Sequence, residues 1–207
     1  MPFNKNGQKK LYSKIYIYRV KFTLAKISGI LFCSILLIAF TKINTIYKIT
    51  EGKITFSSEA SFETITATSE KLTGALDTSN QKFAFFVSNS SFEGFNSLLQ
   101  SEHFKESYIE SEKNPRSVFT GKIIEKVPFQ IPGIYSVRAK GILNIHGVEQ
   151  ERIIKCELTI ENETIKVVSN FSVYLVDHGI AIPRIVFDKI SPEIKISVVA
   201  TLKQKTE

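Results

Sequence analysis

The sequence YSVRAKGILNIHGVEQERIIKCELTIE, residues 135–161, contains the clearest strand pattern in this chain. Its odd positions from 135 to 145 are apolar or small, and most even positions are polar; after His146-Gly147 the even positions 154 to 160 become the apolar ones. A period of two residues places alternate side chains on opposite faces of a β-strand. His146-Gly147 has the length of a hairpin turn. The stretch therefore predicts two antiparallel strands, each with one buried and one solvated face.

The same alternation continues on both sides of this hairpin. Towards the C-terminus it covers residues 165–175 and 194–202, and residues 161–163 form a short turn. Towards the N-terminus it is weaker, and the strand candidates are residues 47–56, 63–76, 82–88 and 117–126, with a bend at Gly74. The fold class predicted is all-β, an antiparallel barrel of about eight strands. We prefer a barrel to a two-sheet sandwich because the strands are long and closure removes the sheet edges.

One segment departs from this alternation. Between Phe95 and Tyr108, Phe95, Leu98, Leu99 and Phe104 are spaced three to five residues apart. This spacing predicts a short amphipathic helix, which would lie near one end of the barrel.

The net charge of +7 is concentrated at the N-terminus. Residues 1–39 contain seven Lys and Arg and no acid, and the remaining 20 Lys and Arg equal the 20 Asp and Glu. A neutral body has no broad attraction for phosphate backbones, so the composition argues against nucleic acid as a partner.

The basic N-terminus is followed by an apolar run, ISGILFCSILLIAF, at residues 27–40. Its length suits a signal peptide better than a spanning helix, which needs about 20 residues. We expect residues 1–39 to be a signal peptide cleaved after Ala39, or an uncleaved N-terminal apolar anchor, and residues 40–207 to form the barrel domain. The chain would then be exported, periplasmic or secreted, or anchored to the inner membrane by residues 27–40. After cleavage only Cys156 remains, so no internal disulfide is expected.

The residue types that support catalysis or metal binding do not cluster in the sequence. His103, His146 and His178 are far apart, and none has a partner at the spacing typical of a zinc site. No serine lies in a nucleophile-elbow pattern, and no glycine-rich phosphate loop is present. The sequence therefore predicts no metal, no cofactor and no enzyme activity.

Several stretches together resemble the YceI-like family. They are KITFSSEA followed by ATSEKLTGALDT, then SFEGFNSLLQSEHFKESYIESEKNPRSVFTGKI, VRAKGILNIHGVEQERII and DHGIAIPRIVFDKISPEIKISVVATL. They occur in the family's order across residues 45–203. One departure is Asn114-Pro115, where the family usually has Tyr-Pro. The resemblance implies an exported lipocalin-like barrel that binds a polyisoprenoid or another long apolar lipid.

A lipid in the barrel would be held by inward side chains. An isoprenoid tail offers no hydrogen bonds, so its affinity comes from apolar area removed from water. The tunnel candidates are Phe83, Phe85, Phe119, Tyr135, Val137, Leu143, Leu158, Phe171, Val173, Ile196 and Val198. Small inward residues at Ala139, Gly141 and Ala200 favour unfilled volume. His103 and Tyr108, near a barrel end, are candidates for contact with a polar head group.

Two alternatives stay open at this stage. The same inward residues are also what an ordinary filled core would contain, and His103 and Tyr108 also suit a surface helix. The competing function is an exported structural or stress-related barrel with a filled core that acts through its surface. Membrane contact is expected only through the N-terminal segment if it is uncleaved, and a homodimer is compatible with the sequence.

Overall fold

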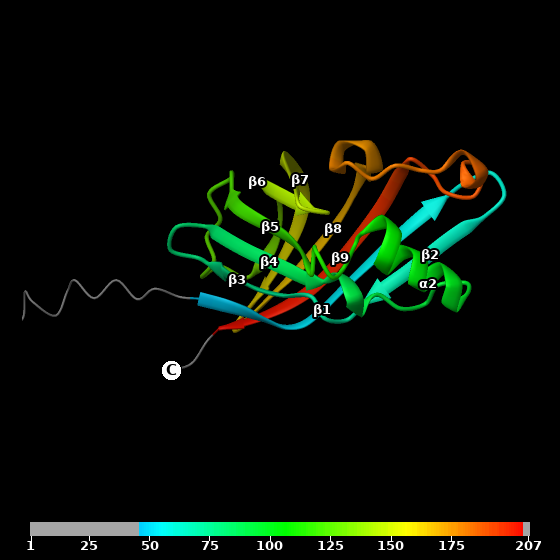
Figure 1. Cartoon of the computed structure of the whole chain (residues 1–207). Coiled ribbons are helices and arrows are strands. Elements are labelled where there is room, and N and C mark those ends of the chain that lie inside the picture. The colour runs from blue at the N-terminus through cyan, green and yellow to red at the C-terminus, as the bar shows by residue number, and fades with distance from the viewer. Residues whose placement is uncertain (1–45, 205–207) are drawn as a thin grey trace, which may run out of the picture. The chain divides into compact units, whose positions relative to one another are not determined.

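The computed structural model describes residues 46–204, in which nine antiparallel strands form one sheet (Figure 1). The strands are β1 (Ile46–Glu59), β2 (Thr64–Ser69), β3 (Thr73–Asp77), β4 (Lys82–Ser88), β5 (Arg116–Ile123), β6 (Gly133–Ile145), β7 (Val148–Glu161), β8 (Thr164–Tyr174) and β9 (Glu193–Gln204). Eight of them close the barrel, because β1 pairs with β3 on one side and with β9 on the other. The predicted eight-stranded antiparallel barrel is confirmed. The predicted export segment, residues 1–39, lies outside the described residues.

Strand β1 has two successive partners along one of its edges. Its first residues, Ile46–Lys48, pair with β3, and the half from Ile54 to Glu59 pairs with β2. The sequence predicted a single strand over residues 63–76, whereas the structure interrupts it between Ser69 and Thr73. The interruption therefore precedes Gly74, where the bend was expected. Before the interruption, β2 pairs with β1 and is a ninth strand outside the closed ring of eight.

The hairpin predicted at residues 135–161 forms as expected. Strands β6 and β7 pair without interruption from Gly133↔Ile160 to Ile145↔Val148. His146 and Gly147 between them have positive φ angles of 55° and 75°. Two successive residues with positive φ are what a type I′ turn requires, and its twist matches that of the strands. Strand parity is also as predicted: Val137 and Leu143 of β6 are buried, and Arg138 and Lys140 are exposed.

The two ends of the barrel differ in how they are covered. The end that we call the mouth carries the connections at residues 60–63, 89–115, 146–147 and 175–192, as the strand registers require. The opposite end is closed by residues 124–132, which place the buried side chains of Val127 and Phe129 in the core. Gln81 holds this segment, because its side chain donates to the carbonyls of Ile123 and Glu125 and accepts from the amide of Val127.

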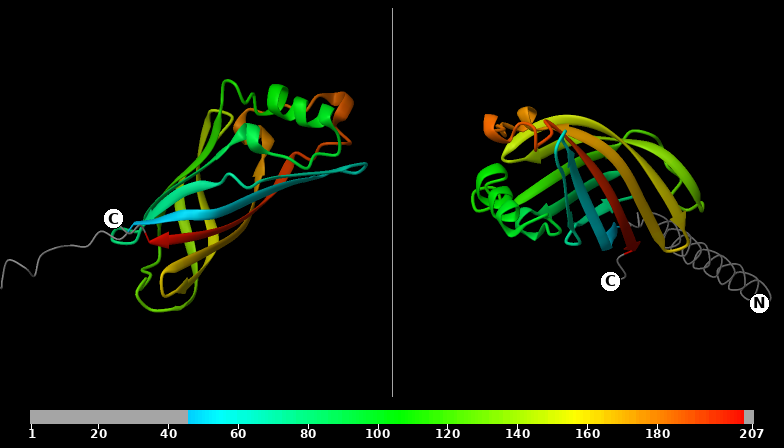
Figure 2. Two further views of the ribbon diagram at one scale, coloured as in Figure 1. Left: turned by 90° about the horizontal axis from the view of Figure 1, so that it is seen from below. Right: turned by 90° about the vertical axis from the view of Figure 1, so that its right-hand side faces the viewer.

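The predicted helix lies in the longest connection, at the mouth. It consists of α2 (Leu98–His103) and a π-helical turn, η2 (Phe104–Tyr108). Ser97 caps α2 by accepting a hydrogen bond from the amide of Gln100 at 3.2 Å. Figure 2 shows this segment at the same barrel end as the connection from β8 to β9, which contains the short helical turns η3 (Leu175–His178) and η4 (Arg184–Val186). No helix among residues 46–204 is long and apolar enough to cross a membrane.

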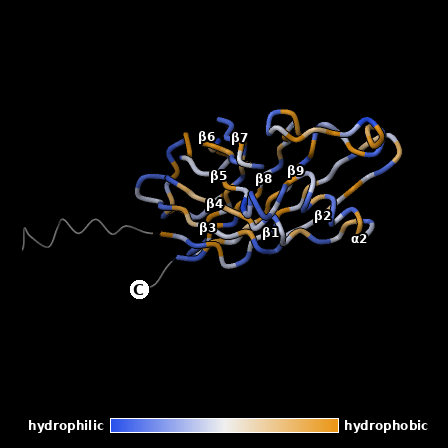
Figure 3. Tube along the Cα trace, viewed as in Figure 1, coloured by the Kyte–Doolittle hydropathy of each residue, from blue (hydrophilic) through white to orange (hydrophobic). Residues whose placement is uncertain are grey.

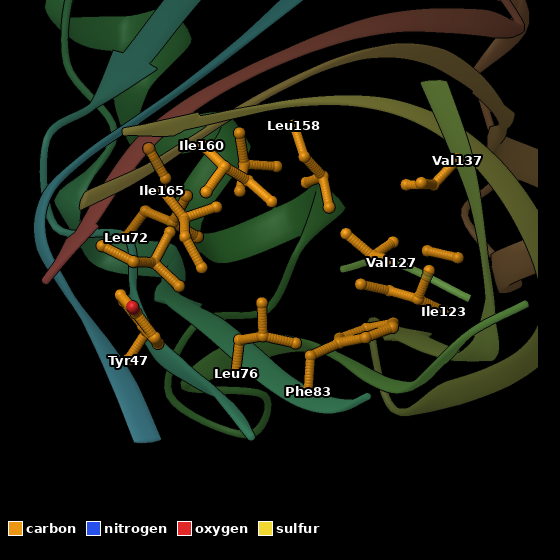
Figure 4. Close-up of a cluster of buried hydrophobic side chains, with 14 of the residues drawn as sticks. Tyr47, Leu72, Leu76, Phe83, Ile123, Val127, Val137, Leu158, Ile160 and Ile165 are labelled. Atoms are coloured by element: carbon orange, nitrogen blue, oxygen red, sulfur yellow. The ribbon is translucent and has the colours of Figure 1, made fainter. Parts of the chain in front are cut away.

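The larger cluster of buried side chains lies mainly in the half of the barrel next to the closed end, and a smaller cluster of Leu143, Val173, Ile194 and Ile196 lies towards the mouth. Figure 4 shows side chains such as Leu76, Phe83, Val137 and Leu158 pointing towards one another from different strands. Gly141 faces Gly121 across β5 and β6, and a Cβ atom at Gly141 would lie 2.1 Å from the carbonyl oxygen of Thr120. Gly141 is therefore explained by the close approach of two backbones, and not by unfilled volume as the sequence suggested.

Candidate functional site

The barrel interior contains a cavity of about 120 Å³, which we call the inner chamber. Its wall comes from all eight strands of the closed ring, β1 and β3 to β9, so that it is enclosed by the barrel itself. Phe83 packs on Phe119 in this wall, with ring centroids 4.9 Å apart. The remaining lining is mostly aliphatic and includes Ile123, Val137 and Leu158. The inner chamber is therefore an apolar space within the buried core.

Few polar side chains line the inner chamber, and those that do are bonded to other parts of the protein. The hydroxyl of Ser169 donates to the carbonyl of Lys155 at 2.8 Å, and the hydroxyl of Ser117 donates to Oδ1 of Asn89 at 2.8 Å. The thiol of Cys156 donates to the backbone carbonyl of Ile154 at 3.7 Å. A molecule in this chamber would therefore contact mainly carbon atoms and would find no side-chain donor or acceptor without a protein partner.

A larger cavity of about 490 Å³ lies at the mouth, and we call it the outer chamber. One side is formed by an aromatic cluster of Phe56, Phe92, Phe95 and Phe104, with ring centroids 5.2 to 5.9 Å apart. The other side is formed by apolar residues of the β8–β9 connection, including Leu175, Ile180 and Val186. The helical segment and this connection therefore enclose a second apolar space above the barrel.

The two chambers are contiguous. Five residues line both of them: Ile54, Val87, Ser117, Ile145 and Ile196. They come from five different strands and form the boundary between the mouth and the barrel interior. The wall of the outer chamber thus continues directly into the wall of the inner one.

The structure places the predicted tunnel residues in three groups. The inner chamber alone is lined by Phe83, Phe85, Phe119, Val137, Leu143, Leu158, Phe171 and Val198. Ile196 lines both chambers, and Val173 lines the outer one. Tyr135 lines neither: it packs against the core near the closed end, and its hydroxyl donates to the carbonyl of Ile131 at 3.0 Å. Its inward position on β6 is correct, but it lies beyond the end of the cavity.

The predicted head-group pair, His103 and Tyr108, lines the outer chamber together with other polar side chains. Burial raises the pKa of the Tyr108 phenol, so this hydroxyl remains a neutral donor at physiological pH. Glu63 accepts hydrogen bonds from the side chains of Asn96 at 3.1 Å and Gln100 at 2.7 Å, and these bonds lower the pKa of its carboxyl group. Lys189 contributes a cation to the same lining. Polar groups therefore occur at the mouth and are nearly absent further in.

The remaining two histidines hold the mouth connections together. The His146 ring lies between the carbonyl oxygen of His178 at 3.1 Å and a carboxylate oxygen of Glu110 at 3.0 Å. His178 is 1% exposed, and burial lowers the pKa of its imidazole, so that it stays neutral near pH 7. Its Nδ1 lies 3.3 Å from the carbonyl oxygen of Val148, to which it donates as the neutral tautomer. Across residues 46–204 no group of three His, Cys, Asp or Glu side chains converges in a way that could hold a metal ion.

Sequence reasoning missed much of the outer chamber. The spacing of Phe95 and Phe104 indicated a helix but not the cavity beneath it, and Phe56 belonged to a strand whose alternation was weak. Val186 and Ile190 lie in a connection without periodicity, so no pattern marked them as inward. The one signal in the sequence was the occurrence of three phenylalanines, Phe92, Phe95 and Phe104, within 13 residues.

The chain matches a known domain family and is similar in fold to solved structures. Residues 41–202 match the model of the YceI-like domain family, which covers most of the chain. No curated protein matches the chain. Among solved structures, a polyisoprenoid binding domain from Saccharophagus degradans, implicated in plant cell wall breakdown, is similar with a TM-score of 0.68 and 13% identity, over 77% of this chain and 98% of that one. BcnA from Burkholderia cenocepacia is similar with a TM-score of 0.60 and 11% identity, over 72% and 95%. At these identities the likeness concerns the fold.

Proposed function

Because this chain belongs to the YceI-like domain family, we propose that it binds one long apolar lipid, of polyisoprenoid or quinone type, inside the barrel and does not convert it chemically. The similar domain from Saccharophagus degradans is described as polyisoprenoid binding, which supports this choice of ligand class. The binding would serve carriage or sequestration of the lipid in the cell envelope, with the chain exported by its N-terminal segment.

The observation that carries the proposal is the contiguous apolar lining of the two chambers. The hydroxyls of Ser117 and Ser169, in the inner chamber, already have protein partners. A polar ligand would lose its bonds to water there without replacement, at a cost of about 1–3 kcal/mol per group. A hydrocarbon loses none and gains about 0.8 kcal/mol for each buried methylene. The lining therefore selects for chain length and apolar character.

The distribution of polar groups sets the direction of binding. The tail would extend through the passage at Ile54 and Ile196 into the inner chamber, since that space lacks free hydrogen-bonding groups. The head group would remain in the outer chamber, within reach of His103, Tyr108 and Lys189. Donors of these three types suit a quinone carbonyl or a phosphate.

The proposal is tested by extraction. The exported protein is purified from its host without detergent, extracted with organic solvent, and the extract is analysed by mass spectrometry. We expect a long-chain isoprenoid lipid at close to one molecule per barrel, and none from a control sample that was unfolded, washed with solvent and refolded. An extract without lipid, together with no uptake of added polyprenol by the refolded protein, would support the filled barrel that acts through its surface.

A further inference from the structure

Large apolar side chains are exposed at the tips of three mouth connections. Phe62, at the β1–β2 turn, is 79% exposed; Leu98, at the start of α2, is 84% exposed; and Ile185, in η4, is 91% exposed. Leu99 and Phe187, next to two of them, are 58% and 60% exposed. Figure 3 shows hydrophobic segments at α2 and along the β8–β9 connection at this end of the barrel. We call these five residues the rim patch.

Hydrogen bonds hold the three tips next to one another. The amide of Phe62 donates to the carbonyl of Asp188 at 3.1 Å, which joins the β1–β2 turn to the β8–β9 connection. Glu63 accepts from the side chain of Gln100 in α2 at 2.7 Å, which joins the same turn to the helical segment. The three connections that carry the rim patch are therefore held side by side.

The rim patch is continuous with the outer chamber. Leu99 belongs to both, since it is more than half exposed and also lines the cavity. In η4, Val186 lines the chamber while its neighbours Ile185 and Phe187 face solvent. An apolar path thus runs from the outer surface over the rim into the barrel.

We propose that the rim patch docks the mouth onto a lipid bilayer by apolar insertion, so that the ligand passes between bilayer and barrel without crossing water. The route of the ligand rests on the proposed function. Exposed apolar tips around a cavity suit an interface between hydrocarbon and water, where Phe and Leu side chains gain most from partial burial.

The charges at the mouth indicate which kind of bilayer the patch requires. Over the connections 60–63, 89–115 and 175–192, Asp and Glu outnumber Lys and Arg eight to four. A net negative mouth is not attracted to anionic head groups. We therefore expect docking to occur on zwitterionic lipid, to be insensitive to salt, and to gain nothing from anionic lipid.

Because the chain contains no tryptophan, single Trp substitutions report the environment of chosen sites. The full-length chain is prepared with Leu98→Trp or Ile185→Trp in the patch, and with Ile153→Trp, which is 57% exposed on the barrel wall, as the matched control. Phosphatidylcholine vesicles with brominated acyl chains are added. We expect a blue shift and quenching for the two patch reporters and neither for the control.

The full-length chain also carries the N-terminal apolar segment, which is a second means of binding to vesicles. A further variant therefore separates binding through the rim patch from binding through that segment. Phe62→Ser combined with Ile185→Ser, in the Leu98→Trp background, should lower the quenched fraction by about tenfold or more. Unchanged quenching in this variant, or equal quenching of the Ile153→Trp control, would overturn the proposal. So would quenching that needs phosphatidylglycerol and disappears at high salt, or a concentration-dependent blue shift without vesicles, which would indicate a second copy of the chain.

Lipid extraction on the same samples keeps this test independent of the proposed function. A barrel that holds lipid but whose patch reporters stay unquenched contradicts docking alone. Quenched patch reporters on a barrel that never holds lipid support docking and contradict the proposed function.

Discussion

Replacing Val137 with tryptophan should shorten the tail that the barrel can hold. Val137 is 3% exposed, lies on β6, and its side chain lines the inner chamber. The chamber's 120 Å³ gives room for roughly eight carbon-sized groups. An indole brings about seven more heavy atoms than the valine side chain and so occupies most of that room.

The size of the effect follows from the carbons that are excluded. If only four methylenes are kept out of the inner chamber, binding weakens by about 3 kcal/mol, which is at least a hundredfold in Kd. A short tail that fits within the outer chamber loses nothing, because its 490 Å³ holds roughly thirty such groups. The loss should therefore depend on chain length. The barrel itself should be destabilised by about 1–3 kcal/mol through overpacking.

The assay compares octaprenol and farnesol binding to the wild type, to Val137→Trp and to Ile134→Trp. Ile134 lies on the same strand, is 69% exposed and faces solvent, so its substitution controls for the added ring. We expect Val137→Trp to lose octaprenol selectively, while Ile134→Trp binds both like the wild type. Equal losses for both ligands, or full retention of octaprenol with urea unfolding unchanged, would refute the assignment of the inner chamber as the site of the tail.

Three further predictions concern single residues. Gly121→Ala should destabilise the barrel by about 3 kcal/mol or more in urea unfolding, because its Cβ would lie 2.1 Å from the carbonyl oxygen of Lys140; a change below about 1 kcal/mol would contradict the close approach of the two strands. Burial holds the pKa of His178 below its usual 6.5. As the pH falls below 6.5, the unfolded chain therefore binds a proton at this histidine that the folded chain does not yet bind. Stability should be complete above about pH 6.5 and fall below it, and His178→Asn should flatten that dependence; an unchanged slope would show that other groups cause it. Burial also raises the pKa of the Cys156 thiol, so in a Cys33→Ser background it should react slowly with a soluble disulfide reagent at neutral pH and more slowly still when lipid is bound. Equal rates with and without lipid would place the tail elsewhere.

The parts of the fold that the sequence predicted are those with a repeating pattern. The alternation in β6 to β9 is regular because one face of each strand meets the interior and the other meets water, and parity identified most of the inward apolar residues on these strands. It did not single out Ser169, which is buried and lines the inner chamber. The turn at His146-Gly147 was recognisable because two residues between two alternating segments have the length of a hairpin turn. These features depend on residues close together in the chain, so a single sequence is enough to recognise them.

The features that the sequence did not predict depend on positions across the barrel. Parity shows that Tyr135 points inward, but not that residues 124–132 close the barrel beside it and leave it outside the cavity. Gly141 appeared to be a source of space, whereas its role is set by Gly121 on the neighbouring strand. The outer chamber depends on two aperiodic connections that meet only in the folded protein, so neither of them indicates a site on its own.

The pairing of β1 with β9 joins Tyr47 to Gln204, almost the two ends of the described chain. During synthesis from the N-terminus, β1 therefore has no partner along one edge until the last strand has emerged. A partly made chain exposes that edge and an unclosed greasy interior, and both favour aggregation. Closure also requires contacts of very long sequence separation, which makes the barrel a slow folder by its topology. That edge of β1 and the barrel interior consequently stay exposed to water until β9 (Glu193–Gln204) has joined the sheet.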